Sequence, residues 1–243
     1  MESNLEILYQ DEHIIAVNKP HGMLVHKSRI AKDETVFVLQ TLKNQINKWV
    51  IPANRLDRQT GGVLLFSLNE NTDKLLKKMF AENKISKTYL CLVRGFPPIS
   101  GTINHDLMKE NGNIQNATTE FETILNFELP IEVSRYPQSR YSIVKAHPIT
   151  GRFHQIRRHF AKERYYIIGD KPHGECKQNK MYEQRFELNT MLLHCYELIF
   201  EHPISNEKLK IRAKLQAPFT STIKKIDVEF ELNIYETLMS EIT

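Results

Sequence analysis

Cysteine, glycine and proline are all scarce in this chain of 243 residues, which has 3 Cys, 9 Gly and 10 Pro. So little Gly and Pro excludes collagen-like and low-complexity chains. Cys91, Cys176 and Cys195 are odd in number and widely spaced, so they cannot form a disulfide framework and they favour a reducing compartment. No apolar run approaches the roughly 18 residues of a membrane span, and the N-terminus lacks the basic start of a secretory signal. We therefore expect a cytoplasmic protein that makes no membrane contact.

Common nucleotide and metal motifs are missing as well. The sequence contains no P-loop motif, no glycine-rich dinucleotide fingerprint and no Cys-x-x-Cys pair. His154 and His159 stand five positions apart, whereas two metal ligands on one helical face need a spacing of four. We therefore expect no metal site.

What is present is an ordinary globular composition, with 41% hydrophobic and 26% charged residues. A chain of this length buries roughly 70–75% of its unfolded surface, which is enough for a sizeable core. The formal net charge is +4, which weakly favours a polyanionic partner such as nucleic acid. Many cytosolic proteins without such a partner carry the same charge, so its distribution is more informative than its sum.

Short apolar runs predict strands, and apolar residues at helical spacing predict helices. The two kinds are interspersed without a regular βαβ order, which favours an α+β fold. The polar stretch 109–119 is predicted to be a mobile loop. We expect one main domain over residues 1–225 and a helical tail over 226–243. Strands are predicted at 5–9, 13–17, 62–68, 88–93, 119–126, 140–145, 192–200 and 208–214, and helices at 35–47, 72–81, 153–162 and 227–242.

Residues 54–62, which read NRLDRQTGG, place one carboxylate between two arginines, just before a Gly pair and a buried strand. This position predicts a turn that presents Asp57 at the edge of a sheet. The positive charges of Arg55 and Arg58 favour an ionised carboxylate, which suits a nucleophile, a base or a stabiliser of positive charge. The residues alone leave open a purely structural alternative, in which Asp57 caps a turn and the arginines are solvated.

Residues 150–159, which read TGRFHQIRRH, predict the start of a helix with Thr150 and Gly151 at its N-terminal cap. Basic and imidazole side chains would then lie opposite an apolar stripe of Phe153, Ile156 and Phe160. Such a face can bind phosphates. An ordinary solvated amphipathic helix is an equally good interpretation of the pattern.

These two segments resemble the signatures of the RluA-type RNA pseudouridine synthases. The first matches as Arg-Leu-Asp-Arg-x-Thr-x-Gly over 55–62, and the second as Thr-Gly-Arg-x-His-Gln-Ile-Arg over 150–157. Asn54, where the family usually has His, and Gly61, where it usually has Ser, depart from the pattern. Further stretches fit the family in the same order, at residues 8–22, 87–89, 168–170 and 192–194.

The resemblance implies an α+β pseudouridine synthase fold, with a largely antiparallel mixed sheet, flanking helices and an active-site cleft across the sheet. It also implies a reaction that breaks the N1–C1′ bond of a uridine, turns the base and rejoins it through C5. No cofactor is implied, because the net change is an isomerisation. Asp57 matches the family's essential Asp, and Arg157 matches the Arg that pairs with it. Attack by Asp57 on C1′ and removal of a proton from C2′ both remain open.

The target base must leave the RNA stack, at a cost of a few kcal/mol. Arg55 matches the family residue that inserts into the vacated space. Tyr89 matches the active-site Tyr, whose ring can stack on the uracil and whose hydroxyl can help to remove the C5 proton; taken alone, it is a strand aromatic in a core. The other candidates for RNA contact are Arg58, Arg152, His154, Arg158, Lys162 and Arg164.

Within the family the chain is most similar to a short tRNA-modifying enzyme, through residues 24–28, 135–141 and 171–174. This implies a tRNA partner, uridine at position 65 as the target and a monomeric enzyme. A ribosomal RNA synthase of the same family is the main alternative. A glycoside hydrolase would need a second carboxylate near Asp57, and a non-enzymatic RNA-binding module would leave Asp57, Tyr89 and Arg157 without a purpose.

Overall fold

The chain folds as two units, each built around its own group of paired strands. The computed structural model describes residues 4–26, 36–134 and 136–242. The first unit comprises Met1–Lys87 and His194–Gln216, and the second comprises Thr88–Leu193 and Ala217–Thr243.

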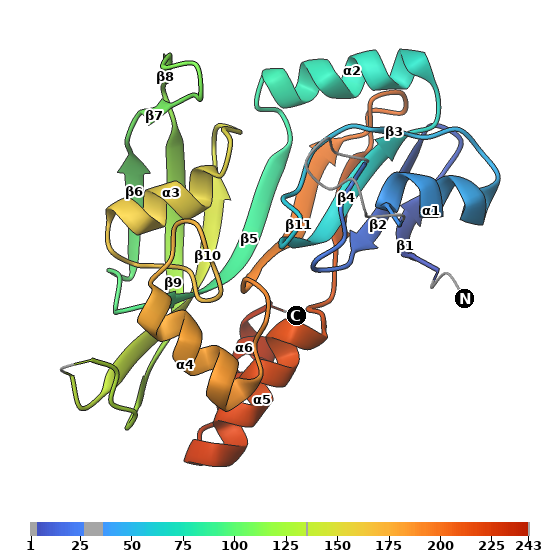
Figure 1. The fold of residues 1–243 in the computed structure, drawn as a ribbon. Coiled ribbons are helices and arrows are strands. Elements are labelled where there is room, and N and C mark those ends of the chain that lie inside the picture. Colours follow the sequence, from blue (N-terminus) through green and yellow to red (C-terminus); the bar gives the residue numbers. More distant parts are fainter. Residues whose placement is uncertain (1–3, 27–35, 135, 243) are drawn as a thin grey trace. The chain divides into compact units, whose positions relative to one another are not determined.

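Strands β2 and β4 form the centre of the first unit, and every residue of both is buried. This burial explains why their sequences are continuous apolar runs rather than alternating ones. The strand order is β1-β2-β4-β11, with β3 beside β4 and β12 beside β11. All these pairs are antiparallel except β4 with β11. The elements are β1 (Glu6–Gln10), β2 (Ile14–Lys19), α1 (Val38–Ile46), β3 (Ile51–Pro52), β4 (Gly61–Ser67), α2 (Glu70–Ala81), β11 (Leu193–Glu201) and β12 (Lys208–Arg212) (Figure 1).

The second unit contains four antiparallel strands in the order β5-β10-β9-β6. Its core packs helix α3 against these strands, and Phe121 meets Phe160 edge to face with ring centroids 5.6 Å apart. The elements are β5 (Ser86–Arg94), β6 (Ser100–Asn104), β7 (Leu107–Met108), β8 (Ile114–Gln115), β9 (Thr118–Leu129), β10 (Ser139–Pro148), α3 (Gln155–Lys162), α4 (Cys176–Phe186), α5 (Ala217–Phe230) and α6 (Ile234–Ile242).

The observed elements confirm the α+β prediction, because helices and strands are interspersed and antiparallel pairing predominates beside the parallel pair of β4 and β11. Helix α4 was not predicted, since its sequence lacks a strong apolar stripe. None of the helices in the described ranges is both long and apolar enough to cross a membrane. The predicted domain boundary at residue 225 stays a prediction.

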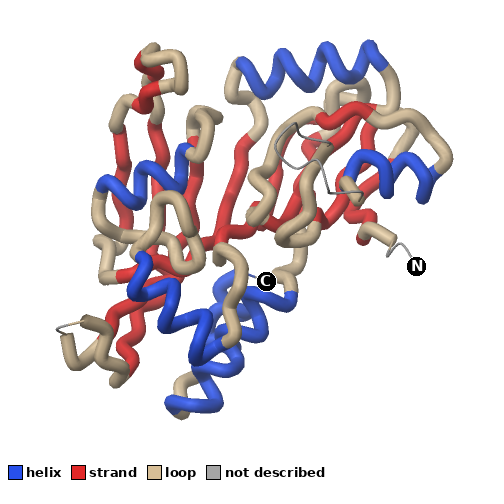
Figure 2. The backbone as a smooth tube through the Cα atoms, viewed as in Figure 1, coloured by secondary structure: helices blue, strands red, loops and turns tan. Residues whose placement is uncertain are grey.

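Two predicted segments differ from the structure. The stretch 109–119 contains regular structure, because it includes β8 and the turn of the β7–β8 hairpin, where Leu107 pairs with Gln115 and Gly112 takes a φ of +83°; its mobility stays a prediction. The predicted helix 227–242 is two helices, α5 and α6, separated by a loop (Figure 2). Both carboxylate oxygens of Asp227 accept bonds from backbone N–H groups at the start of α6, at 2.8 Å each, so this Asp caps a new helix.

Candidate active site

Asp57 lies in the turn that leads into β4, as its position in the sequence predicted. We call residues 54–60 the Asp57 loop. The backbone N–H of Thr60 donates to the carbonyl of Asp57 at 3.0 Å, which closes the turn. Gly62, the second residue of β4, has a φ of +105°, and a Cβ there would lie 2.1 Å from the carbonyl oxygen of Cys195. Only glycine allows strand β11 to approach this closely, so the Gly pair fixes where the loop enters the sheet.

The loop after β2 is hydrogen-bonded to the Asp57 loop through Gly22. The N–H of Gly22 donates to the carbonyl of Arg58 at 2.9 Å, and Arg58 Nε donates to the carbonyl of Gly22 at 2.8 Å. Asp57 itself is half-buried, whereas the Arg55 and Arg58 side chains are exposed. The loop therefore presents an acid between two accessible guanidinium groups, an arrangement suited to a large anionic ligand.

Lys19 is a part of this region that sequence reasoning missed. It is fully buried, and its Nζ donates to the carbonyl oxygens of Pro20, Met23 and Arg58 at 2.9, 2.7 and 3.0 Å. Burial lowers the pKa of Lys19 to about 7, against the opposing influence of the Asp57 charge. One ammonium group thus joins the end of β2 to the Asp57 loop. The signal in the sequence was a lysine that ends an apolar strand, directly before Pro20.

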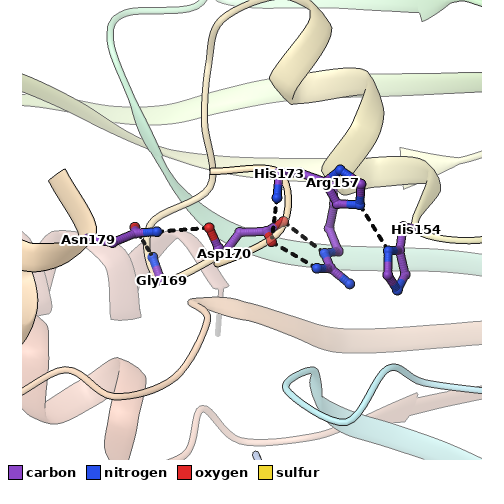
Figure 3. Close-up of polar contacts among 6 residues, drawn as sticks. All are labelled: His154, Arg157, Gly169, Asp170, His173 and Asn179. Atoms are coloured by element: carbon purple, nitrogen blue, oxygen red, sulfur yellow. Dashed lines mark hydrogen bonds and ion pairs between the residues drawn. The ribbon is translucent and has the colours of Figure 1, made fainter. Parts of the chain in front are cut away.

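Arg157 lies on α3 in the second unit and is buried. Its Nε and Nη2 donate to the two carboxylate oxygens of Asp170 at 2.8 Å each, and the Asp170 side chain is only 2% exposed (Figure 3). The N–H of His173 adds a bond to the same carboxylate at 3.2 Å, and Asn179 bonds to the backbone of Gly169 and Asp170. Sequence reasoning did not identify Asp170 as a partner of Arg157. The expected pair of Arg157 with Asp57 stays a prediction, because those residues belong to different units.

His154 and His173 form an imidazole pair beside this ion pair, with Nδ1 of His154 2.9 Å from Nε2 of His173 (Figure 3). One nitrogen must donate and the other accept, so the two rings are not both fully protonated. The His154 ring also stacks on Phe153 with centroids 3.7 Å apart, and Phe153 is 57% exposed. This group places an aromatic and imidazole surface next to the buried Arg157.

The predicted start of helix α3 is wrong. The helix begins at Gln155, and its N-cap is His154 in the left-handed conformation, with a φ of 52°. The Gln155 side chain accepts from Arg152 N at 3.0 Å and Thr150 Oγ1 at 2.7 Å. Thr150 therefore stabilises the turn before α3 from outside the helix and is not the N-cap residue of α3. Phe153 precedes the helix and is exposed, so it does not belong to the apolar stripe.

The predicted basic face is smaller than the sequence pattern indicates, because Arg157 and His159 are buried. His159 bonds to Thr119 Oγ1 and the carbonyl of His105 at 3.0 and 2.9 Å. Burial lowers the pKa of His159 and disfavours its charged form. The side chains left on the accessible part of this region are the exposed Lys162 and Arg164 and the half-buried Arg152 and Arg158.

Tyr89 lies on β5 opposite Ala146 of β10, half-buried and packed on the core of the second unit. It therefore meets the description of a core aromatic, and its catalytic role stays a prediction. Asn54 uses Oδ1 to accept from Leu65 N at 2.9 Å, so this departure from the family pattern has a structural bond. Residues 27, 28 and 135, which contributed to the tRNA-specific resemblance, lie outside the described residues.

Comparisons with known proteins identify the family. The family model described as RNA pseudouridylate synthase matches residues 13–162. The chain is 41% identical over 239 residues to tRNA pseudouridine synthase C of Vibrio parahaemolyticus, covering 94% of this chain and 97% of that protein. It is also 41% identical over 226 residues to the enzyme of that name from Yersinia pestis, covering 88% of each.

A solved structure supports the same fold. Human RNA Pseudouridylate Synthase Domain Containing 1 matches with a TM-score of 0.71 at 22% identity, covering 91% of this chain and 90% of that one. The predicted pseudouridine synthase fold is therefore confirmed.

Proposed function

This chain belongs to the RNA pseudouridylate synthase family, and from that premise we propose that it converts uridine to pseudouridine in tRNA. One observation carries the proposal: a half-buried carboxylate, Asp57, stands between two exposed arginines in a loop fixed by Lys19 and Gly22. The similarity to enzymes named tRNA pseudouridine synthase C supports tRNA as the substrate.

The proposed reaction needs one ionised carboxylate and no net redox change. The N1–C1′ bond of the uridine breaks, the uracil turns, and C5 bonds to C1′ while the C5 proton leaves and N1 gains one. Asp57 begins the reaction either by attack on C1′ or by removal of a proton from C2′. Both routes require the anionic form, which the positive charges of Arg55 and Arg58 favour.

Access to C1′ requires the base to leave the RNA stack. We assign Arg55 to the vacated space, because its guanidinium is exposed and planar and can both stack and donate hydrogen bonds. We assign Tyr89 to the flipped uracil, where its ring stacks and its hydroxyl helps to remove the C5 proton. Arg157 supplies positive charge to Asp57 in this proposal, while Asp170 fixes the orientation of its guanidinium.

The RNA backbone is assigned to the basic residues around α3 and to Arg58. Double-stranded RNA is recognised mainly through shape and phosphates, so the exposed cations and the His154–Phe153 stack suit a folded tRNA. We propose uridine 65 as the target, with added contacts from the β7–β8 hairpin and the segment 135–140. The phosphate candidates are Arg58, Arg152, Arg158, Lys162 and Arg164. We further propose that the enzyme acts in the cytoplasm as a monomer, with residues 1–225 as its catalytic domain.

The test is product analysis on an unmodified tRNA transcript, followed by mapping in cells with and without the gene. We expect pseudouridine at position 65 with unchanged RNA mass, and loss of that modification in the deletion strain. Release of free uracil would identify a glycoside hydrolase instead, and binding without any product would identify an RNA-binding module. If a ribosomal site disappears while position 65 is unaffected, the tRNA assignment is wrong and the chemistry stands.

A further inference from the structure

On the basis of the proposed reaction, we propose that His21 is a positioning residue for Asp57, which it holds through the backbone of Gln59 and through a steric fit to Gly61. His21 lies in the loop after β2, and none of the chemistry above uses it.

The first contact joins the imidazole to the Asp57 loop. His21 Nδ1 lies 2.7 Å from the carbonyl oxygen of Gln59. A carbonyl oxygen can only accept, so Nδ1 carries the proton and donates it. Gln59 lies inside the turn that the bond between Thr60 N and Asp57 O closes. His21 therefore fixes one side of the turn, while Lys19 fixes the other through the carbonyl of Arg58.

The ring is itself held in place. It stacks on His194 with centroids 5.8 Å apart and an angle of 23° between the planes. The backbone N–H of His21 donates to Gln216 Oε1 at 3.0 Å, and Gln216 Nε2 donates to Asn18 Oδ1 and the carbonyl of Lys19 at 2.6 and 2.7 Å. Burial lowers the pKa of His21 to about 4, so the ring is neutral at pH 7 with its proton on Nδ1.

The second link between His21 and the Asp57 loop is steric, and it depends on the absence of a side chain at Gly61. A Cβ at this position would lie 2.5 Å from both Cδ2 and Nε2 of His21. Real Cβ atoms do not approach other atoms so closely, so the ring would have to move. Movement would break the bond to Gln59 and disturb the stack on His194, because both depend on the present ring position. His21 and Gly61 are therefore a matched pair, in which the imidazole fills the space that a larger residue would occupy.

The experiment measures kcat and KM for pseudouridine formation on a tRNA transcript, with the full-length protein and its unfolding midpoint as a check on folding. We expect His21→Ala to lower kcat about tenfold or more with KM within about twofold, because the turn that carries Asp57 is misplaced. His21→Asn keeps an N–H donor near the Nδ1 position, and we expect it to restore kcat to within about threefold of wild type. His13→Ala is the matched control, a histidine of the same unit that no described contact links to the Asp57 loop.

A double-mutant cycle tests the fit to Gly61. We expect Gly61→Ala to lower kcat about as much as His21→Ala, and the double variant His21→Ala/Gly61→Ala to be no worse than His21→Ala alone, because the Cβ then enters the space of the missing ring. A wild-type protein that forms no pseudouridine would contradict the proposed function. An active wild type with unchanged kcat in His21→Ala, equal losses in His21→Ala and His21→Asn, or additive losses in the double variant would each overturn the role of His21.

Discussion

The Asp57 loop and the Arg157 cluster, which consists of Arg157, Asp170, His173 and Asn179, each contain an acid and an arginine, but the acid is buried to different extents. In the first, the loop is fixed by backbone groups and by the side chains of Lys19, His21 and Arg58, and Asp57 is half-buried. In the second, Asp170 is almost fully buried, and both its oxygens accept from Arg157. The difference in burial distinguishes Asp170, a buried carboxylate that orients the Arg157 guanidinium, from Asp57, the half-buried carboxylate to which we assign the chemistry.

The largest effect on stability is expected at Asp170, because its charge is buried. Asp170→Asn removes the buried negative charge that Nε and Nη2 of Arg157 both contact, and we expect a loss of about 3–5 kcal/mol in the free energy of unfolding. Glu175→Gln is the matched control, because it removes the anion from a half-buried pair with Arg94; we expect it to cost about 1 kcal/mol or less. Urea denaturation of both variants measures the difference, and equal losses would remove the distinction between the two pairs.

An intermediate effect on stability is expected when the pH is lowered. Burial lowers the pKa of His21 to about 4 and that of His194 to about 3, so between these values and about 6.5 the unfolded chain binds protons that the folded chain does not. Stability is therefore highest above pH 6.5 and falls as the pH drops, by up to about 1.4 kcal/mol per pH unit for each group. We expect the loss between pH 6.5 and 5 to be smaller in His21→Asn than in wild type, as measured by denaturation at each pH. Equal losses would show that His21 titrates alike in both states.

Sequence reasoning succeeded where the signal is local. The apolar runs of β2 and β4 predict buried strands, and the Gly pair at 61–62 predicts the turn that carries Asp57. It failed where distant residues decide the outcome. The ion pair of Arg157 with Asp170 joins α3 to a separate loop, and the fit of His21 to Gly61 depends on how β2 and β4 come together. The start of α3 was misplaced because a left-handed His154 carries no pattern that periodicity can detect.

The smallest effect is expected for the accessible basic residues Arg158 and Lys162 of α3. Their charges are expected to contribute to RNA affinity and not to the stability of the fold. Each phosphate contact contributes roughly 0.7–0.9 to the slope of log affinity against log salt. We expect Arg158→Ala/Lys162→Ala to reduce that slope by up to about 2, with the unfolding free energy nearly unchanged. The control is Lys74→Ala/Lys78→Ala on α2, which removes the same charge from another exposed face. If only the control pair changes the slope, the RNA follows that face instead.

We assign the chemistry to Asp57 and the stability of its loop to the residues around it. The most direct test is single-turnover pseudouridine formation by Asp57→Asn, with tRNA affinity and the free energy of unfolding measured on the same preparation. We expect the change to abolish turnover because it removes the negative charge, with affinity and stability close to those of wild type because it is nearly isosteric and leaves the backbone bonds of the loop in place. Turnover within tenfold of wild type would contradict the claim, and so would an inactive protein that had also lost its fold.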